Sequence, residues 1–242
     1  MIISFSHKFV FVKTNKTAGS SFEGLLSHYL NSDDWVTSAQ SREEDYRKTA
    51  LKGTKVHYLN GKNADQGSRI NQHARLIAAH QKFPETKDFL SFGILRNPFN
   101  RLVSSFRWRK QRQIQKILKK KSNPLRQQDL IKEKFLAHIV NDQGDLNARG
   151  VNLLFGVDSQ GATWGVDHVF KLEDLLKPKS ILHEQLGLNL DLDIMPRFKE
   201  NTIKIPNEIN LWDKESIKAA IKMFSWEFTN LDYPPTPFAT KH

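Results

Sequence analysis

The hydrophobic positions of this chain fall into short unbroken runs and into stripes with helical spacing. Residues 9–12 form the apolar run FVFV, which is typical of a strand buried on both faces of a parallel sheet. A loop of small and polar residues follows, and beyond it apolar side chains recur at i, i+3, i+4 and i+7: Phe22, Leu25, Leu26 and Tyr29. This spacing places them on one face of a helix, so the pattern predicts a strand, a loop and a helix in succession.

The same succession is predicted a second time. Residues 89–95 form a strand candidate that leads into Asn97 and Pro98. Asparagine is a favourable helix N-cap, and proline suits the first helical position. The helical stripe then recurs at four apolar positions: Phe99, Leu102, Val103 and Phe106.

Weaker patterns complete the prediction. Residues 158–161 have turn chemistry, whereas residues 31–54 are polar without a clear period, and no element is predicted there. The further elements predicted are strands at residues 56–59 and 166–172, and helices over about 70–80 and 125–140, before Gly187, and from Asp213 to about Asn230. Strands that alternate with helices predict a three-layer α/β sandwich with a mostly parallel sheet of about five strands. The length of 242 residues suits a single domain over residues 1–242.

Composition narrows the classes of protein. The chain has no cysteine, which excludes disulfides, zinc-thiolate sites and cysteine nucleophiles. No apolar run approaches the roughly 20 residues of a membrane helix, and the first residues lack the basic region of a signal peptide. We therefore expect a cytoplasmic protein without a membrane span. The net charge of +11 favours anionic partners.

The loop after residues 9–12 has the chemistry of an anion site. A small-residue loop that opens a helix directs several backbone N–H groups at one point, and the helix dipole adds partial positive charge. Lys16 supplies a full charge, and Thr17, Ser20 and Ser21 supply hydroxyls. The order differs from the nucleotide loop G-x-x-x-x-G-K-[ST], because Lys16 precedes Gly19. No apolar strand ends in a clear magnesium-binding aspartate.

Two motifs resemble those of sulfotransferases that use 3′-phosphoadenosine 5′-phosphosulfate (PAPS). Residues 16–22, KTAGSSF, resemble the family's 5′-phosphosulfate loop, close to the form K-T-G-G-T-[ST]-F. Residues 96–106, RNPFNRLVSSF, resemble its 3′-phosphate motif R-[DN]-P-x-x-R-L-x-S-x-[FY]. Residues 166–175 and 226–233 resemble two later segments, V-D-x-[IV]-x-[RK]-x-E-x-L and D-F-x-x-F-x-Y.

The resemblance implies a fold, a co-substrate and a set of site residues. The fold would be related to P-loop kinases, and PAPS would donate a sulfuryl group to a hydroxyl or amine without a metal ion. Arg96 and Ser104 would bind the 3′-phosphate, and Lys16 would also stabilise charge on the leaving oxygen. The residues expected to bind the 5′-phosphosulfate are Lys16, Thr17, Ala18, Gly19, Ser20 and Ser21.

A histidine is the expected general base, because its pKa lies near neutrality. Related sulfotransferases have a histidine some two dozen positions before the 3′-phosphate arginine, and His73 stands 23 positions before Arg96. His80 is the second candidate, and a base other than these two stays open. The structural alternative for either residue is a half-buried histidine that is bonded to backbone.

A basic stretch and two other functions remain to be considered. Nine Lys and Arg residues occur between 107 and 128 without an acidic residue; they suit a polyanionic acceptor such as an anionic glycan, or form a solvated helix face. A P-loop kinase or NTPase and a basic nucleic-acid-binding protein on the same fold are the alternatives, although no specific nucleic-acid motif is present. The basic residues are Arg107, Arg109, Lys110, Arg112, Lys116, Lys119, Lys120, Lys121 and Arg126.

Overall fold

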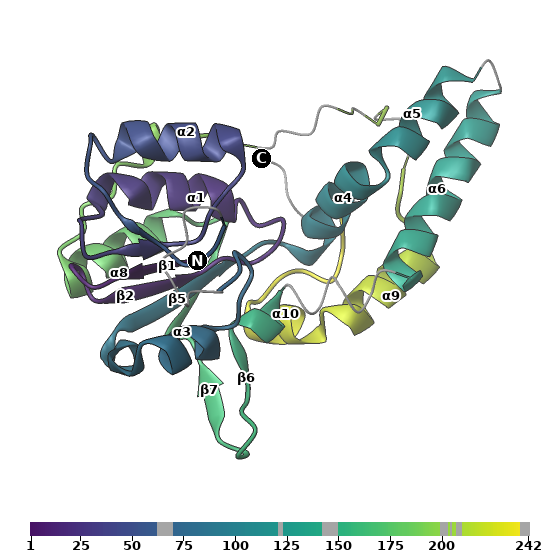
Figure 1. Cartoon of the computed structure of the whole chain (residues 1–242). Coiled ribbons are helices and arrows are strands. Elements are labelled where there is room, and N and C mark those ends of the chain that lie inside the picture. Colours follow the sequence, from purple (N-terminus) through teal and green to yellow (C-terminus); the bar gives the residue numbers. More distant parts are fainter. Residues whose placement is uncertain are drawn as a thin grey trace. The chain divides into compact units, whose positions relative to one another are not determined.

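The computed structural model describes residues 1–61, 70–120, 123–141, 150–198, 203, 205–206 and 210–237. The chain divides into two compact units (Figure 1). The first unit combines Met1–Leu95 with Arg149–Phe198, and the second combines Arg96–Ala148 with Lys199–His242. Each unit has a hydrophobic cluster of its own. Among the described residues, no helix has both the length and the apolar character needed to cross a membrane.

The described part of the first unit contains a six-stranded sheet with the strand order β4-β3-β1-β2-β5-β8. β2 is parallel to β5, β5 to β8, and β3 to β4, whereas β1 is antiparallel to both of its neighbours. The prediction of an α/β fold with a mostly parallel central sheet is confirmed, with one strand more than expected. The strands are β1 Ile2–Ser4, β2 Phe9–Val12, β3 Trp35–Val36, β4 His57–Tyr58, β5 Leu90–Leu95 and β8 His168–Lys171.

Helices cover both faces of this sheet. In Figure 1, α1 and α2 lie above the strands and α3 lies below them. The apolar stripe of α1 packs on β2 and β5, where the ring of Phe22 lies 5.4 Å from that of Phe11 and 6.4 Å from that of Phe92. The predicted turn at residues 158–161 joins a two-stranded hairpin of β6 Phe155–Val157 and β7 Thr163–Gly165. The helices of the unit are α1 Gly19–Leu26, α2 Ser41–Ala50, α3 Leu76–Lys82 and α8 Leu176–Leu186.

The second unit is helical. As predicted, Asn97 caps its first helix, because its side-chain oxygen accepts hydrogen bonds from the amides of Phe99 and Asn100. Asp213 likewise caps α9, but the helix predicted to reach Asn230 is interrupted at Phe224, which separates α9 from α10. The helices are α4 Pro98–Arg109, α5 Gln111–Lys119, α6 Pro124–Asn141, α9 Lys214–Met223 and α10 Ser225–Asn230.

Two sequence predictions for the first unit need correction. Helical spacing over residues 70–80 predicted one helix, yet α3 begins only at Leu76. The backbone before it has other partners: the amide of Ile70 donates to Leu59, and the carbonyl of Gln72 accepts from the amino group of Met1. Residues 31–54, where no element was predicted, contain β3 and α2.

Candidate functional site

The loop between β2 and α1 has an unusual backbone. Lys16 and Ala18 have φ angles of 62° and 57°, in the left-handed region that residues with a Cβ adopt at a cost. Ala18 is also the N-cap residue of α1, and its methyl group makes no capping bond. The motif form with glycine at this position suits such a conformation, because glycine adopts it freely. The loop therefore keeps a conformation that its own sequence disfavours.

Hydroxyl groups hold the loop against the carboxyl end of the sheet. Thr14 donates to the carbonyl of Ile94 in β5 and lies 2.7 Å from the hydroxyl of Thr17. The hydroxyl oxygen of Ser21 accepts from the amide of Phe198 at 3.3 Å. Thr17 and Ser21 thus have partners inside the protein, and the predicted residues 16–21 lie together in one loop.

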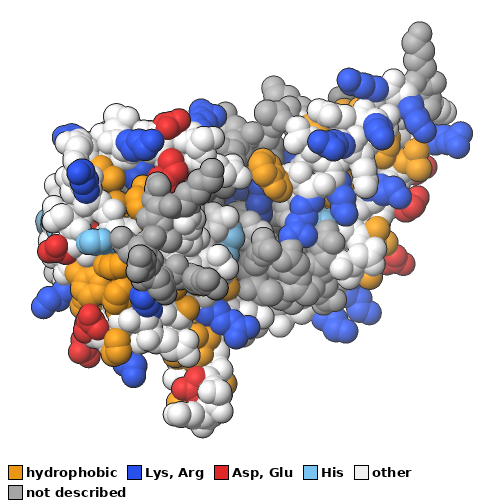
Figure 2. All heavy atoms as spheres, in the orientation of Figure 1, with side chains coloured by type: hydrophobic (Ala, Val, Ile, Leu, Met, Phe, Trp, Pro, Cys, Tyr) orange, Lys and Arg blue, Asp and Glu red, His pale blue; other side chains and the backbone are white. Residues whose placement is uncertain are grey.

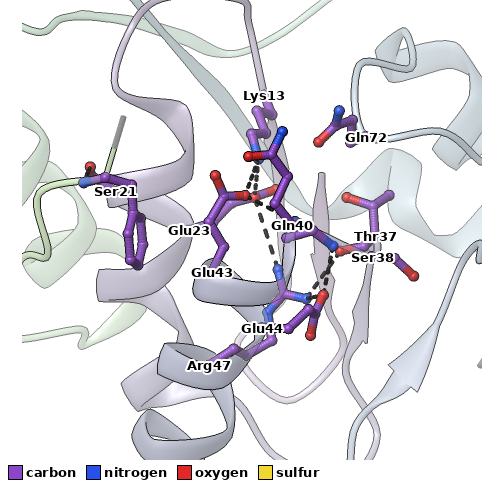
Figure 3. A network of polar contacts seen from close by, with 12 residues as sticks. Lys13, Ser21, Glu23, Thr37, Ser38, Gln40, Glu43, Glu44, Arg47 and Gln72 are labelled. Carbon is purple, nitrogen blue, oxygen red and sulfur yellow. Dashed lines mark hydrogen bonds and ion pairs between the residues drawn. The ribbon is translucent and has the colours of Figure 1, made fainter. Parts of the chain in front are cut away.

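Figure 3 shows a network of polar contacts that includes the charged side chains of Lys13, Glu23 and Arg47. Glu23 of α1 is 2% exposed, and its carboxylate lies 2.6 Å from the ammonium group of Lys13. The guanidinium of Arg47 in α2 lies 3.9 Å from Glu23, and the carboxylate of Glu43 lies 4.0 Å from Lys13. The amino group of Met1 also contacts Glu23, at 2.6 Å. Sequence reasoning missed this network, although Glu23 is a charged residue inside an otherwise apolar and small-residue helix.

The network fixes the charge of Glu23. Burial alone would raise the pKa of its carboxyl group, but the positive charge of Lys13, together with Arg47 and the contact with the Met1 amino group, outweighs burial and holds the pKa well below its ordinary value. Glu23 is therefore a carboxylate at neutral pH. A charged, buried residue of this kind needs the partners that surround it.

His73 lies at the carboxyl end of β2, in the segment before α3. Its Nδ1 atom is 2.9 Å from the carbonyl oxygen of Lys13. Because a carbonyl group only accepts, Nδ1 carries the proton, and Nε2 of the neutral ring keeps its lone pair. Burial lowers the pKa of His73 to about 4; the bond to the Lys13 carbonyl opposes this change, and the Lys13 charge adds to it.

His80, the second candidate, lies in a different place. Its Nδ1 is 3.0 Å from the hydroxyl of Thr86, whose own proton goes to the carbonyl of Phe83. Burial lowers the pKa of His80, and the charges that act on it are those of Lys87 and Asp167. These two residues stand before β5 and β8, so His80 faces the amino ends of the strands.

A polar pocket of about 390 Å³ adjoins His73. Ser38 and Asn60 are joined on its wall, since the Ser38 amide donates to the Asn60 side chain and the Ser38 hydroxyl donates to the Asn60 carbonyl, both at 2.6 Å. Amide and hydroxyl groups both donate and accept hydrogen bonds, as the hydroxyl groups of a ligand do. The lining residues are Ser38, Asn60, Asn71, Gln72 and His73.

The second unit holds the other predicted anion-binding residues. Arg96 directly follows the last residue of β5 and is partly exposed, and Ser104 lies on α4 with 8% of its surface exposed. Arg101 of the same motif is 1% exposed and has a structural partner, because its guanidinium lies 3.4 Å from the carboxylate of Glu227 in α10. Arg101 therefore joins two helices of this unit.

The basic stretch lies mainly on α4 and α5. Figure 2 shows Lys and Arg side chains gathered over this part of the second unit. Ile114 is buried in the core of the unit, which turns the charged side of α5 outward. Lys121 lies outside the described residues. The described residues of the stretch that are exposed are Arg109, Arg112, Lys116, Lys119, Lys120 and Arg126.

Comparison with protein families agrees with these observations. The model of the sulfotransferase family matches residues 1–234. The match spans nearly the whole chain, so the chain belongs to the sulfotransferase family. No curated protein and no solved structure matches it.

Proposed function

We propose that this protein transfers the sulfuryl group of PAPS to a hydroxyl group, with His73 as general base. Family membership supports sulfuryl transfer in general. The observation that carries the finer proposal is the bond between His73 Nδ1 and the Lys13 carbonyl, three residues before Lys16 of the predicted phosphosulfate loop. The base and the loop thus meet at the carboxyl end of one strand, the edge where open α/β sheets bind their ligands.

The proposed reaction needs one proton acceptor and one anion-stabilising group. Nε2 of His73 takes the proton of the acceptor hydroxyl as its oxygen forms a bond to sulfur. The bond between sulfur and the bridging phosphate oxygen breaks, and 3′-phosphoadenosine 5′-phosphate (PAP) leaves. Lys16 stabilises the charge that grows on that oxygen, an interaction that is strongest in the transition state. With a pKa of about 4, His73 is neutral at neutral pH, so the lone pair of Nε2 is available to accept the hydroxyl proton.

Two sets of residues bind the nucleotide in this proposal. The backbone amides of residues 17–21 bind the 5′-phosphosulfate at the start of α1, where the helix dipole favours an anion. Arg96 binds the 3′-phosphate through two parallel hydrogen bonds, and Ser104 adds a hydroxyl donor. That both units act as one sulfotransferase domain with a P-loop-kinase-like fold stays a prediction, as does the independence from metal ions.

The pocket beside His73 is the proposed acceptor site. Its amide and hydroxyl groups suit an acceptor with several hydroxyl groups, and a volume of about 390 Å³ lies in the range of ordinary small-molecule sites. The basic stretch would bind the anionic groups of an acceptor such as an anionic glycan. The alternatives of a kinase and of a nucleic-acid-binding protein gain no support from the family match.

A transfer assay tests the proposal directly. The protein is incubated with PAPS labelled in its sulfur and with a panel of neutral and anionic oligosaccharides, and in parallel with ATP labelled in its γ-phosphate. We expect label to move from PAPS to a hydroxyl-bearing acceptor, with or without EDTA. Transfer from ATP but not from PAPS, lost in EDTA and restored by magnesium, would replace the proposal with the kinase alternative.

A further inference from the structure

We propose that the buried Lys13–Glu23 ion pair is a positioning device that holds His73 in the tautomer needed for proton transfer. The inference rests on the proposed role of His73 as general base. It concerns two residues that lie outside both the loop motif and the acceptor pocket. Neither residue would touch the substrate, so both are positioning residues and not catalytic ones.

The ion pair locks the end of β2 to α1. Lys13 directly follows β2, and its ammonium group lies 2.6 Å from Glu23, which belongs to the second turn of α1. The side chains are 3% and 2% exposed, so water competes little for either charge. The contact therefore fixes the direction in which the Lys13 side chain leaves the backbone.

The start of α1 is shaped around the Lys13 side chain. A Cβ atom placed on Gly19 would lie 2.8 Å from Cγ of Lys13 and 3.4 Å from the carbonyl oxygen of Thr14. The aliphatic part of Lys13 thus crosses the first residue of the helix at close contact, and only glycine leaves room for it. The loop that we propose for PAPS and the ion pair beneath it share this packing.

The backbone of the same lysine carries the bond to His73. Its carbonyl oxygen accepts the Nδ1 proton at 2.9 Å, and this bond selects the tautomer in which Nε2 is the acceptor. Lys13 therefore links α1 to the base: its side chain is held by Glu23, and its carbonyl group binds His73. Second-sphere groups that orient histidine ligands of metals act by the same principle.

Stability alone gives a poor account of this pair. Buried ion pairs are often no more stable than apolar side chains of the same volume, because the cost of removing two charges from water offsets their attraction. Here the carboxylate faces Lys13, Met1 and Arg47 together, and the geometry of the cluster is set by several elements at once. The cluster around Glu23 therefore holds Lys13 in a fixed position.

The test combines a variant of the pair with a control from the same cluster. In Glu23→Gln we expect kcat to fall about 10- to 100-fold, with PAP affinity within about twofold of the parent. Long-range ¹⁵N NMR should show that the share of His73 protonated at Nδ1 falls. Glu44→Gln removes a carboxylate 2.7 Å from Arg47 but no contact of Lys13, and it should leave both the kcat and the tautomer unchanged.

A second variant covers the case in which Glu23→Gln does not fold. Lys13→Met keeps the backbone carbonyl and leaves Glu23 with Met1 and Arg47 as partners, and it should reproduce the loss. A folded variant of the pair with unchanged tautomer and kcat would overturn the inference, as would an equal loss in Glu44→Gln. If the parent protein does not use PAPS at all, the proposed function fails, but the tautomer measurement still decides the positioning role.

Discussion

The two ends of the strands in the central sheet, called here the carboxyl edge and the amino edge, carry similar residues. They differ in what surrounds those residues. At the carboxyl edge lie Lys16, in a left-handed conformation, and His73; at the amino edge lie Lys8, also left-handed with a φ of 54°, and His80. Both histidines are held through Nδ1. The amino edge even has the larger hollow, about 590 Å³ against about 390 Å³.

The difference lies in the backbone that follows the lysine. Lys16 belongs to a loop that opens a helix, so amides and a helix dipole accompany its charge. Lys8 is followed directly by β2, and its carbonyl accepts the amide of Leu90 from the neighbouring strand. Residue type and pocket size do not show which edge binds an anion. The position of α1 does, because its N-terminus lies beside Lys16 and no helix begins directly after Lys8. The predictions below compare matched residues from the two edges.

The largest difference is expected between the two histidines. His73→Ala should lower turnover by about 10²- to 10⁴-fold, the usual contribution of a general base, while PAP affinity barely changes. His80→Ala should keep turnover close to that of the parent, because His80 faces the amino edge. Steady-state kinetics with PAPS checks both. If His80→Ala lost turnover and His73→Ala did not, His80 would be the general base.

The two lysines should differ in nucleotide binding. Lys16→Ala should weaken PAP binding by about 10- to 100-fold, since a hydrogen bond to a charged group contributes about 1.5–3 kcal/mol, and it should lower turnover as well. Lys8→Ala, a substitution at the same backbone conformation on the opposite edge, should leave PAP binding unchanged. Calorimetric titration of both variants measures the effect; equal losses would show that the overall positive charge, and not the loop, attracts the nucleotide.

Acid should destabilise the protein through His73. In the unfolded chain its pKa is about 6.5, and in the folded protein it is about 4, so the unfolded state binds more protons between these values. Stability is therefore lost as the pH falls from 6.5 towards 4, by about 2 kcal/mol from this residue between pH 7 and pH 5. Denaturant titrations at pH 7 and pH 5 measure this loss. Between the two pH values, the free energy of unfolding of His73→Asn should fall by about 2 kcal/mol less than that of the parent protein. An identical pH dependence would mean that His73 is solvated when folded.

The sequence predicted the elements whose buried sides are apolar. The FVFV run and the stripe from Phe22 to Tyr29 became β2, α1 and the short helical turn after it, and Asn97 and Asp213 cap helices as expected. α2 escaped prediction because the side that it buries consists of Glu43, Arg47 and Ala50. The spacing of apolar residues cannot reveal a helix whose buried side consists of charged residues in an ion-pair network.

The candidate site could be predicted from the sequence where its residues are contiguous, and not where they come from distant parts of the chain. Residues 16–21 are contiguous, so their motif shows the loop directly. The bond between His73 and Lys13 joins residues 60 positions apart, and spacing along the chain indicated the histidine but not its partner. The Lys13–Glu23 pair had no pattern of its own, since each residue reads as an ordinary surface charge until burial is known.

The central claim is that the nucleotide is PAPS, and its distinguishing group is the 3′-phosphate. Calorimetric titration of the protein with PAP and with ADP, repeated on Arg96→Ala, tests it most directly. We expect PAP to bind about 100-fold more tightly than ADP, because two charge-assisted hydrogen bonds to the 3′-phosphate are made only by PAP, and we expect Arg96→Ala to lose most of that preference. Equal affinity of the parent protein for PAP and ADP would contradict the account.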